Sequence, residues 1–120
     1  WGLLPVTAEE ALDADAGGQH RRYMVHGTSH HLGIDVHDCA QARREMYYDG
    51  VLEEGMVFTI EPGLYFQIDD LTVPAEYRGI GARIEDDIVM TADGPVNLSA
   101  SIPRTADEVE AWIARLAPKA

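Results

Sequence analysis

The sequence predicts an α+β fold with a mainly antiparallel sheet and flanking helices. Short runs of β-branched and aromatic residues are separated by turns rich in Gly and Pro, and a segment with helical spacing ends the chain. The strands do not alternate regularly with helices, so a parallel sheet with crossover helices is not expected. The chain has 120 residues, the length of one domain, and we expect residues 1–120 to form a single unit.

Helices are expected in three segments that contain good helix formers or helical spacing, at 6–16, 40–48 and 105–116. The first begins where Thr7 and Glu10 have the spacing of a capping box, and two glycines follow it. Thr105 and Glu108 form a second capping box ahead of the last segment, whose apolar residues recur at helical spacing.

Strands are expected in four apolar or alternating runs, at 23–25, 56–60, 64–68 and 82–90. Pro62-Gly63 separates the second run from the third, and a loop is expected at 74–81. A turn is expected at 93–95, where Asp, Gly and Pro follow the last strand.

The charge balance is strongly acidic, with nine Lys and Arg against 21 Asp and Glu and a formal net charge of −12. This charge repels phosphate backbones and anionic lipid surfaces, so neither nucleic acid nor a membrane is an expected partner. No apolar run approaches the ~20 residues that span a bilayer. Because Cys39 is the only cysteine, we expect a protein of the reducing cytoplasm. The first residue is Trp1 and not Met, so we also expect a piece of a longer protein.

Residues 26–38 contain four of the five histidines, interleaved with Asp and Gly. Imidazole is a common metal ligand and a proton carrier near pH 7, and glycine lets a backbone approach a bound group closely. Any one of these histidines is better explained as a hydrogen-bonded core or surface residue. The clustering of four favours a site.

Glu61 ends an apolar run and precedes a Pro-Gly turn. Strand alternation places it on the same face as Val57 and Thr59. An ionised carboxylate beside a core costs several kcal/mol unless something compensates it. The equally acceptable alternative is a strand that ends at Ile60, with Glu61 solvated in the turn.

Residues 79–89 mix charged and apolar side chains on both faces of the predicted strand, and Arg83, Glu85 and Asp87 share one face. Pairing Arg83 with Glu85 or a neighbouring carboxylate would lower the cost of burial, and a metal ion would lower it further. The alternative is an edge strand that its charges keep soluble.

Imidazole and carboxylate ligands together suit Mn²⁺, Co²⁺, Zn²⁺ or Fe²⁺. Carboxylates also bridge ions ~3.5–4 Å apart in two-metal hydrolases. The residues by themselves therefore indicate a candidate metallohydrolase site.

Three strings of this sequence, in order, closely resemble the Xaa-Pro aminopeptidase (aminopeptidase P) family: HGTSHHLGIDVHD, GMVFTIEPGLYF and GIGARIEDDIVMT. The resemblance runs from about His20 to the C-terminus and covers the C-terminal half of the catalytic domain. It implies the pita-bread fold shared with proline dipeptidase and methionine aminopeptidase. It also implies a metallopeptidase that releases the N-terminal residue from peptides with proline in second position.

The resemblance implies two divalent ions, typically Mn²⁺, with Co²⁺ or Zn²⁺ as alternatives. His30 and Glu61 look like ligands of one ion, and Glu85 looks like the carboxylate that bridges both. Glu61 also has an implied role in proton transfer toward the proline nitrogen. Arg83 resembles a group that orients a metal-binding carboxylate.

His37 resembles a histidine that contacts the substrate carbonyl and the tetrahedral intermediate, and His26 resembles a histidine of the pocket for the penultimate proline. The implied nucleophile is a hydroxide held between the two ions. His31 stands where many relatives carry Trp. Cys39 and His20 match no catalytic position.

The family also needs two aspartate ligands that lie well before the first string, and no segment of this sequence matches them. Asp13 and Asp15 fall in a predicted helix and are expected at the surface. We therefore expect the N-terminal domain and the first half of the catalytic domain to be absent, and the isolated chain to be inactive. The intact enzyme is expected to be a homo-oligomer.

Other functions remain open at this point. Proline dipeptidase would share these ligands but would accept only Xaa-Pro dipeptides. A metal-free pita-bread domain that binds peptides or proteins is the alternative from another class. An acidic structural domain would require all three strings to be coincidental.

Overall fold

A computed structural model describes residues 1–15, 17–38 and 44–117. The chain divides into two compact units. Unit 1 comprises Trp1–His30 and Thr59–Glu85, and unit 2 comprises His31–Phe58 and Asp86–Ala120. Both contain antiparallel strand pairs, which confirms the predicted α+β class with antiparallel pairing. Within the described ranges, no helix is long and apolar enough to cross a membrane.

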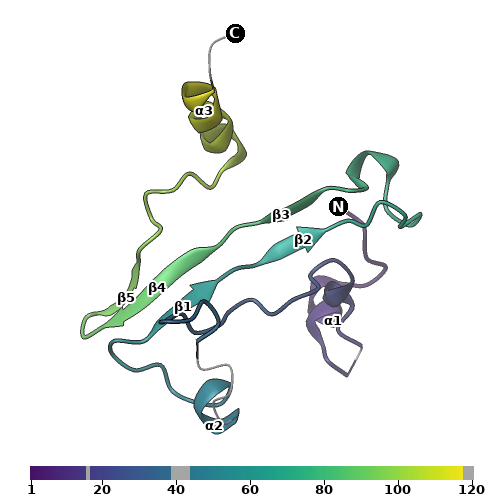
Figure 1. Cartoon of the computed structure of the whole chain (residues 1–120). Helices are drawn as coiled ribbons and strands as arrows, with labels where there is room; N and C mark the ends of the chain where they lie inside the picture. The colour runs from purple at the N-terminus through teal and green to yellow at the C-terminus, as the bar shows by residue number, and fades with distance from the viewer. Residues whose placement is uncertain (16, 39–43, 118–120) are drawn as a thin grey trace. The chain divides into compact units, whose positions relative to one another are not determined.

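Unit 1 consists of short elements: α1 (Ala8–Leu12), the 3-10 helices η1 (Gln19–Arg22) and η2 (Ala75–Tyr77), and strands β2 (Gly63–Tyr65) and β3 (Gly81–Arg83). Strands β2 and β3 are antiparallel, with Gly63 opposite Arg83 and Tyr65 opposite Gly81 (Figure 1). In this register, Glu61, just before β2, and Glu85, just after β3, lie at the same end of the strand pair.

The core of unit 1 is small and partly aromatic. Tyr23, Phe66 and Val73 are buried, and Leu3, Leu4 and Tyr77 pack against them. The Tyr23 and Phe66 rings meet edge to face with centroids 5.1 Å apart, which is a favourable arrangement of two aromatic quadrupoles.

Unit 2 contains α2 (Arg44–Tyr47), β4 (Asp86–Thr91), β5 (Gly94–Asn97) and α3 (Ala106–Leu116). Strand β1 (Val57–Ile60) begins in this unit, and its last two residues belong to unit 1. The sheet order is β1-β4-β5, and β4 and β5 form an antiparallel hairpin (Figure 1). The Arg104 guanidinium anchors the segment before α3 to the start of β4, because its Nη2 lies 2.5 Å from Asp86 Oδ1.

Both predicted capping boxes are present. The hydroxyls of Thr7 and Thr105 each accept a hydrogen bond from the backbone N–H three residues on, and the carboxylates of Glu10 and Glu108 accept one from the backbone N–H of the cap residue. The first helix is nevertheless shorter than the predicted 6–16. It ends at Leu12 because the Asp13 carboxylate accepts a hydrogen bond from the Asp15 N–H at 2.8 Å, which starts a turn.

The prediction of a strand at 23–25 is wrong. The backbone N–H groups of Tyr23 and Met24 both donate to the carbonyl of His20, at 3.2 and 3.1 Å, so the chain turns there. The apolar character of Tyr23 reflects its place in the core instead. The predicted loop at 74–81 likewise contains a short 3-10 turn, η2.

The prediction of one strand at 82–90 is also wrong, because β3 ends at Arg83 and β4 begins at Asp86. The two strands have different partners: β3 pairs with β2, and β4 pairs with β5. The strand predicted at 64–68 is Gly63–Tyr65. Of the helix predicted at 40–48, only Arg44–Tyr47 lies within the described residues.

Candidate metal centre

Backbone pairing positions His30 beside the end of β1. The Thr59 N–H donates to the His30 carbonyl at 2.9 Å, and the Glu61 N–H donates to the Thr28 carbonyl at 2.8 Å. Residues 28–30 therefore run antiparallel to residues 59–61. Paired residues share a face and alternate residues return to it, so His30, Thr59 and Glu61 project to the same side.

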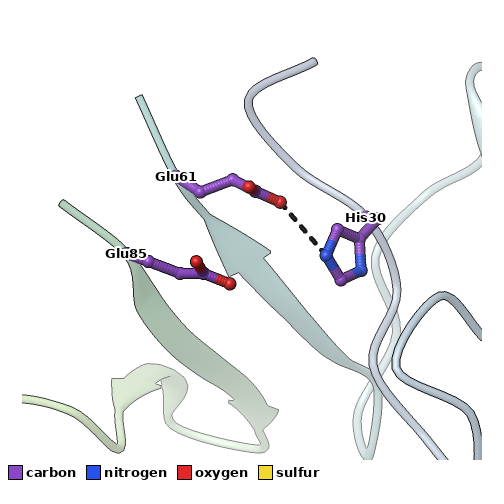
Figure 2. A group of neighbouring side chains, drawn as sticks. All are labelled: His30, Glu61 and Glu85. Atoms are coloured by element: carbon purple, nitrogen blue, oxygen red, sulfur yellow. Dashed lines mark ion pairs between the residues drawn. The ribbon is translucent and has the colours of Figure 1, made fainter. Parts of the chain in front are cut away.

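Glu85 reaches that side through the β2-β3 register. Gly63 lies opposite Arg83, and the Ile84 N–H donates to the Pro62 carbonyl at 3.2 Å. One further step along this ladder places Glu61 opposite Glu85. The candidate ligands thus come from three adjacent backbone segments, and their side chains point toward one another (Figure 2).

The side chains meet at short distances. His30 Nε2 lies 3.1 Å from Glu61 Oε1 (Figure 2). Arg83 Nη1 lies 3.2 Å from Glu61 Oε2. Arg83 Nε lies 3.4 Å from Glu85 Oε2, so one guanidinium contacts both carboxylates. Ligand atoms of His30, Glu61 and Glu85 all lie within 4.8 Å of one another.

Glu61 is buried in this group, with 6% of its surface exposed. Strand β1 does end at Ile60, as the solvated-turn alternative requires, but the carboxylate is not solvated. A buried carboxylate needs a counter-charge. Arg83 is the cation shown to contact Glu61 and Glu85, so the two carboxylates and the guanidinium leave a formal charge of −1 when His30 is neutral.

This donor set fits a divalent cation of the Mn²⁺, Co²⁺ or Zn²⁺ type, which accepts imidazole and carboxylate ligands together. The formal charge of −1 that Glu61, Glu85 and Arg83 leave together also favours binding of a cation. Ligand atoms ~2.1 Å from one ion and at right angles to each other are about 3 Å apart, and the His30–Glu61 contact of 3.1 Å is close to that spacing.

Buried Thr59 was not expected to have a functional role. Its side chain is 1% exposed, and its hydroxyl donates to Glu61 Oε1 at 3.0 Å. The sequence signal was its position two residues before Glu61, on the same face of a strand.

Tyr65 is a second residue that the sequence analysis missed. Its hydroxyl lies 2.8 Å from His26 Nε2, and His26 Nδ1 lies 2.6 Å from the Gly27 carbonyl. A carbonyl only accepts, so Nδ1 donates and the Tyr65 hydroxyl donates to Nε2 of the neutral ring. A Cβ on Gly63 or Gly81 would lie 2.8 or 2.9 Å from atoms of this tyrosine.

Each of the other histidines is described within its own unit. His37 belongs to unit 2, and its side chain is exposed. His31, also in unit 2, forms a bridge with Phe58 and packs its ring 5.3 Å from that of Tyr47. His20 Nδ1 lies 2.7 Å from the Ala11 carbonyl, a contact that stabilises the end of α1. Cys39 lies outside the described residues.

The family profile of metallopeptidase family M24 matches residues 4–92 of the chain. Xaa-Pro aminopeptidase 1 of Streptomyces coelicolor is 64% identical over 116 residues, which cover 97% of this chain and 23% of that protein. The Xaa-Pro aminopeptidase of Escherichia coli is 46% identical over 110 residues, which cover 92% of this chain and 24% of that protein.

Solved structures agree with this result. Zn-substituted aminopeptidase P of Escherichia coli, in complex with product, superimposes with a TM-score of 0.80 at 43% identity. The match covers 98% of this chain and 26% of that one. The chain therefore has part of the pita-bread fold of these enzymes, and it spans about a quarter of the length of the curated relatives it matches.

Proposed function

We propose, from the premise that the chain belongs to metallopeptidase family M24, that it is the C-terminal portion of the catalytic domain of an Xaa-Pro aminopeptidase. The enzyme releases the N-terminal residue from peptides with proline in second position. The observation that carries this proposal is the convergence of His30, Glu61 and Glu85 on one face of unit 1. The high identity to two Xaa-Pro aminopeptidases supports the same substrate class.

His30, Glu61 and Glu85 would hold divalent metal, with Mn²⁺ as the proposed ion and Glu85 as the ligand shared by two ions. When bound, such ions lower the pKa of a water molecule and polarise the carbonyl of the peptide bond. Arg83 contacts both Glu61 and Glu85. It would keep both carboxylates oriented toward the metal and prevent their mutual repulsion.

The remaining roles belong to ionisable side chains of this chain. Glu61 would move a proton from the attacking water toward the proline nitrogen. His37 would donate a hydrogen bond to the carbonyl oxygen as negative charge develops on it. His26 would border the pocket for the penultimate proline, with its tautomer fixed by Gly27 and Tyr65.

The described residues supply three of the five ligands that the family resemblance implies. We therefore propose that the isolated chain binds Mn²⁺ weakly and does not hydrolyse peptides, and that the intact enzyme is a cytoplasmic homo-oligomer. Hydrolysis of an Xaa-Pro-Xaa tripeptide by the pure chain would contradict the proposed inactivity.

A chimera tests the activity itself. The matching segment of the Streptomyces coelicolor enzyme is replaced by the corresponding 116 residues of this chain. We expect the chimera to release the first residue of Xaa-Pro-Xaa tripeptides only when Mn²⁺ is present, and His30→Ala to abolish that release. A control peptide with alanine in second position should not be cleaved.

Two outcomes would overturn the proposal. A folded chimera that binds Mn²⁺ but leaves tripeptides intact would show that these residues do not support the reaction. Turnover of Xaa-Pro dipeptides alone would instead indicate a proline dipeptidase.

A further inference from the structure

We propose that Thr59 is a positioning residue of the metal centre. Its hydroxyl fixes the Glu61 carboxylate and the main chain of His30, so that two of the candidate ligands are oriented before a cation binds. This inference rests on the proposed function, because it assigns Glu61 and His30 to metal binding.

The hydrogen bonds around Thr59 have a single direction. The His30 N–H can only donate, and it lies 3.1 Å from Thr59 Oγ1. An ionised carboxylate can only accept, and Glu61 Oε1 lies 3.0 Å from the same oxygen. The hydroxyl therefore accepts from His30 and donates to Glu61, and its proton has one position.

Thr59 also offers the more rigid of two supports for Glu61. Arg83 contacts Oε2, but its side chain is 45% exposed and is shared with Glu85. Thr59 contacts Oε1, is 1% exposed and is β-branched, so its χ1 angle has little freedom. Together the two residues hold the carboxylate at both oxygens.

The same oxygen that Thr59 contacts also faces the other ligand, because His30 Nε2 lies 3.1 Å from Glu61 Oε1 (Figure 2). The single hydroxyl of Thr59 thus fixes the position of both Glu61 Oε1 and the His30 backbone N–H. Partners of this kind around metal ligands typically change metal affinity 10- to 100-fold when they are removed.

A purely structural role for Thr59 would be packing inside the strand pair. Thr59→Val keeps the shape and removes the hydroxyl, whereas Thr59→Ser keeps the hydroxyl and removes the methyl group. If Thr59 acts only by packing, Thr59→Val should resemble wild type more closely than Thr59→Ser does. If its hydroxyl positions the ligands, Thr59→Ser should resemble wild type more closely. The two variants therefore separate the two roles.

Thr91→Val supplies a matched control. Like the Thr59 hydroxyl, the Thr91 hydroxyl donates one hydrogen bond and accepts one from a backbone N–H. It donates to the Gly94 carbonyl at 2.8 Å and accepts from the Asp93 N–H at 3.3 Å. It lies on β4 in unit 2. Its removal costs a comparable pair of hydrogen bonds without touching the candidate ligands.

The experiment measures the Mn²⁺ dissociation constant of the whole chain and of each variant by calorimetric titration. We expect Thr59→Val to weaken binding by about 10- to 100-fold. Thr59→Ser and Thr91→Val should remain close to wild type. Equal affinities for Thr59→Val and wild type would overturn the inference, as would an equally large loss in Thr59→Ser.

A metal-free readout separates this inference from the proposed function. In EDTA, amide hydrogen exchange at His30 should accelerate in Thr59→Val but not in Thr59→Ser, because the N–H loses its acceptor. If Thr59→Val does not fold, Thr59→Ala provides the hydroxyl-free comparison. A wild-type chain that binds no Mn²⁺ would contradict the proposed metal site. Unchanged exchange at His30 would contradict the positioning role.

Discussion

Metal binding should raise the thermal stability of this chain, and His30 should carry that effect. A ligand that binds only the folded state stabilises it by RT ln(1 + [L]/Kd), which is about 1.4 kcal/mol when the free ion is at ten times Kd. The entropy of unfolding near 60 °C is roughly 2.1 cal/mol/K per residue, or about 0.25 kcal/mol/K for a chain of 120 residues. Mn²⁺ at that concentration should therefore raise the melting temperature by about 6 °C.

His30→Ala removes the imidazole that lies 3.1 Å from Glu61 and should abolish this shift. The comparison is made within each variant, between Mn²⁺ and EDTA, so that any loss of intrinsic stability cancels. His20→Ala is the matched control, because His20 is also half-buried but bonds the Ala11 carbonyl at the end of α1. It should lower the melting temperature in both buffers and leave the shift unchanged.

Differential scanning calorimetry at several Mn²⁺ concentrations gives both the shift and Kd. A shift of the same size in His30→Ala would mean that the ion binds elsewhere on this acidic chain. The absence of any shift in wild type would favour the metal-free binding domain over the metallopeptidase.

Two further predictions concern stability alone. Hydrogen bonds from Arg104 hold the pKa of Asp86 below its ordinary value, with an additional hydrogen bond from Asn97. The stabilisation that this pair contributes is therefore complete above the unfolded-state pKa of Asp86 and is lost as pH falls through its lower folded-state pKa. Asp86→Asn should accordingly weaken the fall of the urea midpoint with decreasing pH. An unchanged fall would refute the pairing. Phe66→Ala should destabilise the chain by about 3–4 kcal/mol in urea unfolding, because Phe66 is 7% exposed and packs on Tyr23, and a loss under about 1 kcal/mol would contradict the core assignment.

Local features of the fold were predictable because they depend on residues close in sequence. Thr105 and Glu108 are three residues apart, and their reciprocal hydrogen bonds need only one helical turn. The shared face of Thr59 and Glu61 follows from strand alternation in the same way. The Arg83–Glu85 contact also joins residues two apart.

Predictions failed where distant partners decide the local structure. The alternating pattern at 82–90 predicts one strand, yet β3 and β4 are separate because β3 pairs with β2 and β4 pairs with β5. Tyr23 was predicted to lie in a strand, yet it lies in a turn and packs on Phe66, 43 positions later in the sequence. Neither partner is visible in the local pattern.

The sequence by itself determined the fold class, the charge and the choice of candidate ligands, because composition, spacing and the three strings are properties of the chain. Only the tertiary structure decided that Glu61 is buried, that Arg83 contacts two carboxylates and that Thr59 bonds both Glu61 and His30. Those contacts depend on the register between segments far apart in sequence. A slip of one residue would turn every side chain to the opposite face.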